Sequence, residues 1–379
     1  MTPNGGYFDF VLPTKVRFGP GQRTEVVSEI RRRGFERVGL VTTEEIVELG
    51  LHEELTEKLR NDKKKVKLFT GVTSNPHLSN IKEGYQVLQE FGADCLVGLG
   101  GGSAIDVTKG VSLCLANQES DLVYLDKQSE NVKPALPFFA LPTTSGTGSE
   151  VDYWAVISSP EKNQKLSIGM PQMAPLTAIV DPELTLTLPP ELTFFTGIDA
   201  FSHALEAFFS AESNELSDML SLKAMELVFE SLETAVHHGD NLPARGDMAL
   251  ASTLGGAAMQ HVGLGLIHAM SHQVSGFYDT NHGLANALLL PNVLQFNEEA
   301  TPERTELLEQ QLDASLAEEI DQLLEIRDLS DYQVALDPED LPEMVKRAMN
   351  NVNAETNPRT ASREEVRELF VASFGVEES

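Results

Sequence analysis

The stretch VGLGGGSAIDVTKG, residues 97–110, contains the transition on which the fold depends. It starts with apolar residues typical of a buried strand, continues through three consecutive glycines, and ends with apolar residues at helical spacing. Glycine allows the backbone to turn sharply and to approach a ligand closely. The first turn of the helix then offers free N–H groups and the positive end of the helix dipole, which suit a phosphate. The stretch predicts a strand, a turn and a helix, and the turn either binds a phosphate or is simply tight.

The spacing of small residues in this turn narrows the choice of ligand. The pattern Gly98-x-Gly100-x-x-Ser103 approaches the fingerprint of a dinucleotide-binding turn, although such a turn is weak evidence alone. The turn is not a Walker A loop, because Lys109 is followed by Gly110 and the order Gly-Lys-Ser/Thr is absent. Of these two phosphate-binding classes, a dinucleotide site is favoured.

Outward from this turn, short β-branched runs alternate with helical patterns, which is typical of βαβ units and a parallel sheet. The helical patterns at 21–34 and 79–92 end in glycine, a common helix stop. We predict a Rossmann-like α/β domain over residues 1–187 that binds a dinucleotide. Its predicted strands are 37–43, 65–69, 94–100, 137–144 and 176–182, with a further strand or hairpin arm at 154–159.

The residue pattern of the sequence changes after Pro189 and Pro190, and we interpret this proline pair as a domain joint. From there onward the pattern is helical and β-branched runs are few. This predicts an all-helical second domain over residues 188–379. Residues 298–345 are very acidic and contain leucines at helical intervals, which indicates surface helices.

A second loop of small residues, LPTTSGTGSEV (141–151), follows another predicted strand. Thr143 and Thr144 offer hydroxyl donors without bulk. Ligands of open α/β sheets gather at the carboxyl ends of strands, so two such loops suit the pyrophosphate and nicotinamide ends of a dinucleotide. Lys165 either pairs with a ribose or phosphate of that ligand or is an ordinary solvated lysine.

Carboxylate and imidazole side chains recur among apolar residues of the second domain. Asp199 and His203 lie four residues apart in TGIDAFSHALEAFFS, His268 and His272 lie four apart in LIHAMSH, and His282 follows in DTNHGLAN. Residues four apart share one helix face, and a buried ionised carboxylate costs several kcal/mol unless something pairs with it. A single such pair is more often only hydrogen-bonded, and HAMSH lacks the glutamate of the zinc-protease helix. One carboxylate with three or four histidines from three segments nevertheless predicts a divalent metal site.

Composition excludes several classes of partner. The formal net charge is −30, from 58 acidic against 28 basic residues. Such a surface repels nucleic acid and anionic membranes, and no apolar stretch reaches the ~20 residues that a membrane helix needs. Since MTPNGGYFDFVLP does not resemble a secretory signal, we expect a cytoplasmic protein without nucleic-acid or membrane partners. The acidic surface also suggests a halophilic, salt-adapted protein, although an ordinary acidic enzyme fits it too.

Four motifs in combination resemble the iron-containing (group III) alcohol dehydrogenases: GGGSAIDVTKG, PTTSGTGSEV, GIDAFSHALEAF and HAMSHQVSGFYDTNHGLANALLLP. The resemblance covers residues 7–297 and resumes at 357–374. It implies a dehydroquinate synthase-like fold, with a parallel-sheet domain followed by a helical domain. It also implies a metal site of one aspartate and three histidines, and a non-ligand histidine near the nicotinamide that takes part in proton transfer. The metal positions are Asp199, His203, His268 and His282, and the proton-transfer position is His272.

The same resemblance assigns residues to the cofactor. Gly101, Gly102 and Ser103 match the pyrophosphate turn, and Asn75, Asp106, Thr143, Thr144 and Lys165 match other cofactor-side positions. Thr43 stands where many members have an aspartate that binds the adenosine ribose and repels a 2′-phosphate. A neutral residue removes that repulsion, but Glu44 and Glu45 follow it and no arginine or lysine is near. NAD and NADP both stay open.

The implied function is a metal-dependent, NAD(P)-linked alcohol dehydrogenase or aldehyde reductase. The metal, Fe(II) in preference to Zn(II), polarises the substrate oxygen as a Lewis acid, and a hydride passes to or from nicotinamide. The resemblance implies a small alcohol or aldehyde as the substrate and a homodimer or larger homo-oligomer as the assembly.

Three alternatives stay open from the sequence. A relative of dehydroquinate synthase or glycerol dehydrogenase would take a polyol or a phosphorylated substrate. The phosphorylated substrate needs a basic pocket, and residues 191–297 contain only Lys223 and Arg245 as lysine or arginine. A metal- or nucleotide-binding sensor without activity is the second alternative. Metal-free maleylacetate reductase is the third, and it is disfavoured because all four ligand positions are filled.

Overall fold

The computed structural model describes residues 7–159, 164–332 and 334–376. Contacts divide the chain into two units. The α/β unit comprises Leu12–Leu188 and Gly239–Thr253, and the helical unit comprises Met1–Val11, Pro189–His238 and Leu254–Ser379. The main change of unit along the chain lies next to the proline pair at which we placed the domain joint.

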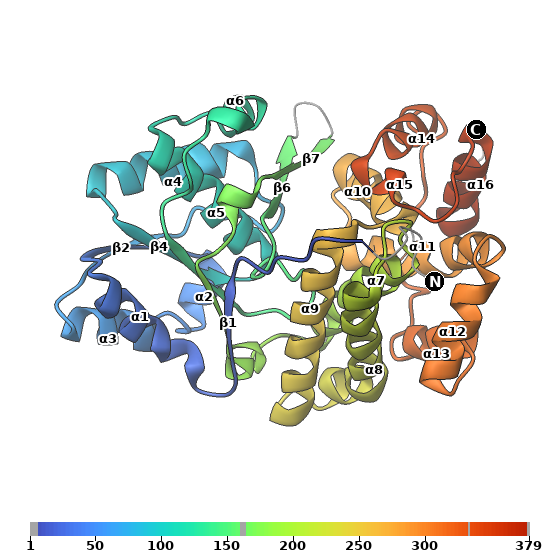
Figure 1. Cartoon of the computed structure of the whole chain (residues 1–379), viewed down its shortest axis with the longest axis horizontal. Helices are drawn as coiled ribbons and strands as arrows, with labels where there is room; N and C mark the ends of the chain where they lie inside the picture. Colours follow the sequence, from blue (N-terminus) through green and yellow to red (C-terminus); the bar gives the residue numbers. More distant parts are fainter. Residues whose placement is uncertain (1–6, 160–163, 333, 377–379) are drawn as a thin grey trace. The chain divides into compact units, whose positions relative to one another are not determined.

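The α/β unit is built on a sheet of six parallel strands in the order β1-β8-β5-β4-β2-β3 (Figure 1). The strands are β1 (Lys15–Phe18), β2 (Arg37–Val41), β3 (Lys65–Phe69), β4 (Cys95–Gly100), β5 (Phe138–Pro142) and β8 (Thr177–Val180). The α/β architecture with a parallel sheet is confirmed, and the five strands predicted for it are all present. The edge strand β1 is an addition that the sequence did not predict.

The middle strands are buried because helices cover both faces of the sheet. Every residue of β4 and β5 is buried, as expected of a parallel sheet enclosed by helices. Two helices, α1 (Glu25–Arg33) and α3 (Glu53–Asn61), contribute to the apolar core on one face (Figure 1). On the other face the core is formed with α4 (Leu78–Phe91) and α5 (Gly102–Asn117).

The strand order creates a switch point between β2 and β4. The chain passes from β2 to the edge strand β3 and then returns to β4 on the other side of β2. The connections on the two sides leave in opposite directions there, which opens a crevice at the carboxyl ends of the strands. Ligands of open α/β sheets bind at such a point, and the glycine-rich turn after β4 lies at it.

A second, smaller sheet belongs to the same unit. It is an antiparallel pair of β6 (Trp154–Ser159) and β7 (Gln164–Gly169), so residues 154–159 form a hairpin strand as expected. The remaining short elements are α2 (Glu44–Glu48), α6 (Leu122–Lys127) and the 3₁₀ turns η1 (Gln22–Thr24), η2 (Ser129–Asn131), η4 (Pro171–Met173) and η5 (Pro182–Thr185).

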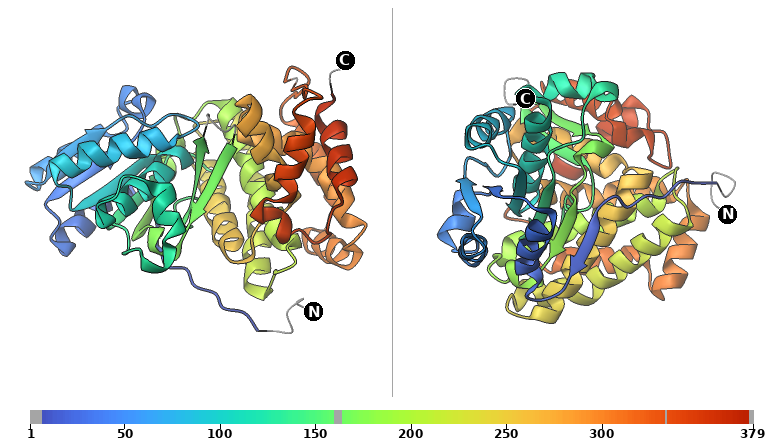
Figure 2. Two further views of the ribbon diagram at one scale, coloured as in Figure 1. Left: turned by 90° about the horizontal axis from the view of Figure 1, so that it is seen from above. Right: turned by 60° about the vertical axis from the view of Figure 1, so that its left-hand side comes forward.

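The helical unit confirms the expectation of an all-helical second part. Its long helices are α7 (Pro190–Phe209), α8 (Glu215–His237), α10 (Leu266–Tyr278) and α11 (His282–Glu298), and α9 (Leu242–Val262) begins in the α/β unit and ends here. Its other helices are α12 (Pro302–Leu312), α13 (Leu316–Glu325), α14 (Leu341–Met349), α15 (Val352–Glu355) and α16 (Arg363–Phe374). α7 packs against α8 and α11, while α14 and α16, drawn in red, pack together and lie side by side in both views of Figure 2.

The acidic helices α12 and α13 lie at the surface, as their composition predicts. Leu308 is the one buried residue of α12, and α13 buries Leu316, Ile320 and Leu323. Among the described residues, no helix combines the length and apolar character that crossing a membrane requires.

Candidate functional site

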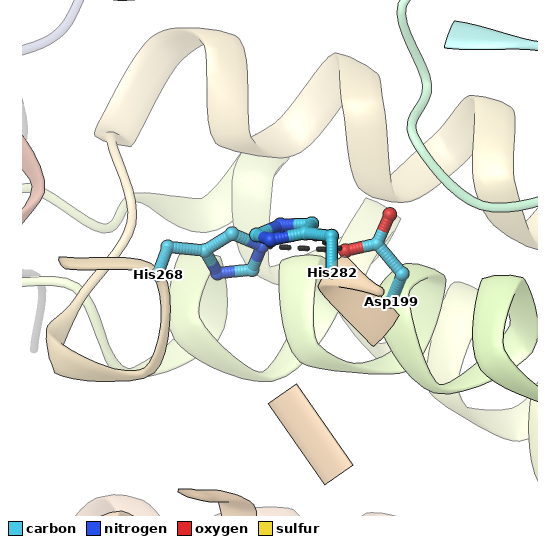
Figure 3. Close-up of side chains that lie close together, drawn as sticks. All are labelled: Asp199, His268 and His282. Carbon is cyan, nitrogen blue, oxygen red and sulfur yellow. Dashed lines mark ion pairs between the residues drawn. The ribbon is translucent and has the colours of Figure 1, made fainter. Parts of the chain in front are cut away.

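Three histidine side chains, carried by three helices of the helical unit, converge on the carboxylate of Asp199. Asp199 and His203 lie one turn apart on α7, His268 lies on α10, and His282 is the first residue of α11. The Nε2 atoms of His268 and His282 each lie 3.5 Å from Asp199 Oδ1, and His203 Nε2 lies 3.8 Å from it. Figure 3 shows the side chains of Asp199, His268 and His282 pointing toward one another. The structure thus brings together the four residues that the sequence suggested as metal ligands.

The donor atoms of this cluster suit one divalent metal ion. Ligand atoms of Asp199, His268 and His282 all lie within 4.8 Å of one another. The His203 ring stacks on the His268 ring, with the two centroids 4.5 Å apart. Imidazole nitrogens together with one carboxylate oxygen are typical ligands of Fe(II) and Zn(II). The residues present therefore fit a metal by their chemistry as well as by their spacing.

The charge of Asp199 is costly because the side chain is buried. Only 3% of Asp199 is exposed. Burial alone would raise its pKa, but His203, His282 and His268 hold that pKa well below its ordinary value, so Asp199 is ionised. Burial would lower the pKa of His268, but hydrogen bonds to Asp199 and Glu206 raise it to about 9. An ionised carboxylate in a dry site needs a cation, and a divalent metal supplies a charge that neutral imidazoles lack.

Glu206 binds His268 through Nδ1, the ring nitrogen that does not face Asp199, and the sequence did not lead us to predict this role. Glu206 Oε2 accepts a hydrogen bond from His268 Nδ1 at 2.6 Å, and Oε1 accepts one from the Ile267 N–H at 2.6 Å. With Nδ1 as the donor to Glu206, a neutral His268 ring carries its lone pair on Nε2, where it can bind a metal ion as metal-binding histidines usually do. A signal was available, because Glu206 follows His203 by three residues and so shares its helix face.

Asn286, one turn after His282 on α11, was also missed. Its side-chain Nδ2 donates to Asp199 Oδ1 at 2.8 Å and lies 3.5 Å from His268 Nε2. The side chain is fully buried, and its Oδ1 has no hydrogen-bond partner within the described part of the chain. An orphaned buried oxygen beside a carboxylate and two imidazoles is the kind of atom that a bound cation or its water would satisfy.

His272 lies beside the cluster without being among the atoms closest to Asp199. Its ring centroid is 5.3 Å from that of His282 and 6.2 Å from that of His268. Its Nδ1 lies 3.4 Å from Asn351 Nδ2, and the side chain is buried. This position suits a residue that acts next to the ligands, as the resemblance implied.

In the α/β unit, the two glycine-rich loops contact each other. A Cβ atom at Gly102 would lie 2.7 Å from Thr147 Cγ2, and one at Gly101 would lie 3.1 Å from Thr144 Cγ2. The Thr143 N–H donates to the carbonyl of the last residue of β4 at 3.0 Å. Gly101 is also the N-cap of α5. The free N–H groups of that helix therefore lie where the two loops meet.

Two further positions assigned to the cofactor follow the neighbouring strands. Ser103 Oγ donates to the Ser74 carbonyl at 2.5 Å, which places the segment containing Asn75 beside the start of α5. Thr43 follows β2 and is the N-cap of α2, and its Oγ1 accepts the Ile46 N–H at 3.4 Å. Thr43 thus follows β2, which flanks the switch point, whereas the segment containing Asn75 follows the edge strand β3.

The last two cofactor positions are associated with the β6–β7 hairpin. Asp106 Oδ1 accepts from Ser149 Oγ at 2.5 Å, and Asp106 Oδ2 accepts the Val156 N–H of β6 at 2.9 Å. Lys165 lies on β7, opposite Ser158 of β6. Asp106 therefore connects α5 with both the second loop and the hairpin, and Lys165 lies on the other strand of that hairpin.

Comparison with known proteins places these residues in context. Residues 13–182 match the family model described as iron-containing alcohol dehydrogenase. Residues 193–374 match the model of the C-terminal part of the Fe-containing alcohol dehydrogenase family. Together the two matches cover both the dinucleotide-type loops and the Asp–His cluster.

Individual relatives agree with these matches. Alcohol dehydrogenase 4 of Schizosaccharomyces pombe is 34% identical, over 96% of this chain and 89% of that protein. Lactaldehyde reductase of Escherichia coli K12 is 33% identical, over 95% of this chain and 98% of the reductase. Among solved structures, an archaeal halo-thermophilic alcohol dehydrogenase from a Red Sea brine pool aligns with a TM-score of 0.89 and 31% identity, over 97% of this chain and 99% of that one.

Proposed function

Because the chain belongs to the iron-containing alcohol dehydrogenase family, we propose that its Asp–His cluster is the metal site and its paired loops the cofactor site of catalysis. The chain is a metal-dependent, NAD(P)-linked oxidoreductase that interconverts alcohols and aldehydes. The relatives do not favour the dehydroquinate-synthase alternative. The observation that supports the site assignment most strongly is the convergence of three histidines on Asp199 Oδ1.

The proposed metal ligands are Asp199, His203, His268 and His282, with Fe(II) preferred over Zn(II) as in the family description. When bound, a divalent metal supplies a Lewis acid that acidifies an alcohol hydroxyl and polarises an aldehyde carbonyl. The chain holds the ligand atoms ready for it. Glu206 fixes the orientation of the His268 ring, and Asn286 fixes the Asp199 carboxylate. Such supporting hydrogen bonds raise metal affinity by limiting how far each ligand can turn.

His272 is the proposed group for proton transfer. Oxidation of an alcohol releases a proton from its hydroxyl, so a residue beside the metal site has to carry that proton away. His272 is buried next to His282 and reaches Asn351 through its Nδ1. Histidine is the side chain whose ordinary pKa lies nearest to neutral pH, which suits the residue type to this role.

The proposed cofactor residues are Thr43, Asn75, Gly101, Gly102, Ser103, Asp106, Thr143, Thr144 and Lys165. Nicotinamide supplies the hydride acceptor or donor when the cofactor is bound. The chain contributes the N-terminus of α5 for the pyrophosphate and hydroxyl donors from the second loop. At Thr43 a neutral side chain tolerates a 2′-phosphate, but the exposed Glu44 and Glu45 repel it, so we favour NAD over NADP.

We also propose a small primary alcohol or its aldehyde as the substrate, in line with the names of the relatives. A homodimer or larger homo-oligomer and a cytoplasmic location stay predictions. Salt adaptation is supported by the net charge of −30 and by the halo-thermophilic character of one relative.

The activity test uses protein freed of metal and then loaded with Fe(II), under exclusion of oxygen, or with Zn(II). Absorbance of the reduced nicotinamide is followed with a panel of alcohols and aldehydes, with NAD and NADP in parallel. We expect turnover that requires the metal and prefers NAD. Absence of turnover with every substrate, either cofactor and either metal would refute the proposal and favour a sensor without activity.

A further inference from the structure

Lys109, excluded above as a Walker-type lysine, is fully buried inside the α/β unit. None of its surface is exposed, and it is among the largest completely buried side chains in the described part of the chain. Its Nζ donates to Ser149 Oγ at 2.7 Å, to Asp152 Oδ1 at 2.5 Å and to the Trp154 carbonyl at 2.6 Å. An ammonium group has three donors, so every one of them is used.

The same hydrogen-bond network reaches Asp106, the carboxylate proposed for the cofactor. Lys109 Nζ lies 3.5 Å from Asp106 Oδ1, one turn away on α5. Ser149 Oγ bridges the two side chains, because it accepts from Lys109 and donates to Asp106 Oδ1 at 2.5 Å. Asp152 Oδ1 also accepts the Trp154 N–H at 2.8 Å. The lysine therefore sets where Asp106 and residues 149–154, from the end of the second loop to the start of β6, lie relative to each other.

The stability of the fold alone does not explain why the charged ammonium group of Lys109 is buried. Removing an ammonium from water costs several kcal/mol, and a buried ion pair is often no more stable than well-packed apolar residues. An apolar side chain at position 109 would fill the same space, but it could not hold three polar groups of the 149–154 segment. What the lysine provides is a fixed arrangement of those groups around the start of α5.

We propose that Lys109 is a positioning residue for the cofactor: it links α5, which begins at the first glycine-rich turn, to residues 149–154, which run from the end of the second loop to the start of β6, and so holds Asp106 and both loops ready for a dinucleotide. The inference rests on the proposed cofactor role of these loops. Lys109 itself is fully enclosed and acts only through Ser149, Asp152 and Asp106.

The chain carries its own reporter for this network. Trp154 is its single tryptophan, and both its backbone N–H and its carbonyl belong to the network. Reduced nicotinamide absorbs light where tryptophan emits, so a bound reduced cofactor quenches Trp154 fluorescence. A titration with NADH or NADPH then gives a dissociation constant that does not depend on turnover.

The test compares the metal-loaded wild type with three variants. Lys109→Met leaves Asp106 and Asp152 without their cation, so it is expected to lose stability. The double variant Lys109→Met/Asp152→Asn removes a charge of each sign and keeps the packing. Val111→Ala on the same helix is the matched control, because Val111 is buried in the apolar core away from the network. Melting temperature and metal content are measured for each variant alongside the dissociation constant.

We expect the double variant to fold, to retain its metal, and to bind the reduced cofactor about tenfold or more weakly, with a raised KM for cofactor and a much smaller change in kcat. Val111→Ala should lower the melting temperature without weakening cofactor binding. Wild-type cofactor affinity in the double variant would overturn the proposal. An equal loss in Val111→Ala, or failure of both lysine variants to fold, would assign Lys109 to stability alone and overturn it too. If the wild type itself does not bind the reduced cofactor, the proposed cofactor site is wrong and this inference loses its premise.

Discussion

At the scale of single residues, the site is organised around one buried carboxylate. Asp199 is ionised although it lies in an apolar helix, because the neighbouring histidines lower its pKa. The four-residue spacing of Asp199 and His203 puts both on one helix face, which makes them recognisable in the sequence as candidate ligands. Glu206 and Asn286 are harder to predict, because their roles depend on α10 and α11 packing beside α7. Sequence spacing shows which residues share a helix, but it does not show which helices meet.

A first prediction concerns Glu206. In Glu206→Gln one of the two side-chain oxygens is replaced by an NH₂ group, which donates hydrogen bonds and does not accept them. The remaining oxygen cannot accept from both His268 Nδ1 and the Ile267 N–H, as the two oxygens of Glu206 do. The His268 ring loses part of its restraint, so we expect the affinity for the divalent metal to fall by about 10–100-fold. Competition with a chelator measures that affinity directly. Glu215→Gln, at an exposed position on α8, is the control. Wild-type metal affinity in Glu206→Gln would show that the hydrogen bond does not support the site.

At the scale of elements, the sequence predicted the buried strands of the parallel sheet better than its edge strand β1. β4 and β5 are continuous apolar runs, which local pattern reveals. β1 has only four residues, KVRF, and depends on pairing with β8 more than 150 positions later. Its lysine and arginine both bond to Glu29 of α1. Such a long-range strand cannot be recognised from local sequence, because its stability comes from partners remote along the chain.

A second prediction concerns the contact between the two glycine-rich loops. In Gly102→Ala the added Cβ would lie 2.7 Å from Thr147 Cγ2, so the loops have to separate. We expect a cost of about 1–3 kcal/mol and a raised KM for the cofactor, with the metal content unchanged. Gly246→Ala on α9 is a matched control, since its Cβ would meet only Pro182 Cγ at 3.8 Å. Unchanged cofactor kinetics in Gly102→Ala would remove the loop contact from the cofactor site.

A third prediction concerns the pH dependence of the β1 edge. Burial by itself would raise the pKa of Glu29, but hydrogen bonds from Lys15 and Arg17 lower it from 4.5 to about 2. A carboxyl whose pKa is lower in the folded than in the unfolded protein stabilises the fold above its unfolded pKa. This contribution is lost as the pH falls from 4.5 toward about 2.

The measurement compares Glu29→Gln with the wild type in denaturant unfolding across that pH range. We expect the variant to be less stable near neutral pH and the difference to shrink steadily as the pH approaches the folded pKa of Glu29. Glu364→Gln, at an exposed position of α16, controls for the loss of one negative charge. A difference between variant and wild type that stays constant with pH would contradict the proposed ion pairing.

At the scale of the whole molecule, two features bear on what the sequence pattern can reveal. The main change of unit lies beside the proline pair, as local composition suggested. The assignment of Gly239–Thr253 to the α/β unit was not predicted, because α9 is one uninterrupted helix. Contacts decide it: Thr253 Oγ1 donates to Glu150 at 2.8 Å, and the Arg245 guanidinium donates to the Leu188 carbonyl at 3.0 Å. Each of these contacts joins residues that are remote in sequence.

A fourth prediction follows from the net charge of −30. Repulsion among surface carboxylates opposes the compact state, and salt screens that repulsion as the Debye length shrinks to about 3 Å at 1 M. We expect the melting temperature to rise as potassium chloride is increased from low concentration to about 1 M. Potassium chloride is preferable to a sulfate, because strongly excluded salts stabilise most folded proteins. A melting temperature that stays level or falls would refute salt adaptation.

The most direct test of the proposed metal centre is the metal content of His268→Ala, measured by elemental analysis beside the wild type and His272→Ala. His268 is proposed as a ligand and His272 only as its neighbour, so the two alanine variants differ in the one property at issue. We predict about one divalent metal ion per chain in the wild type and in His272→Ala, and very little in His268→Ala. A full complement of metal in purified His268→Ala would contradict the ligand role on which the proposed mechanism depends.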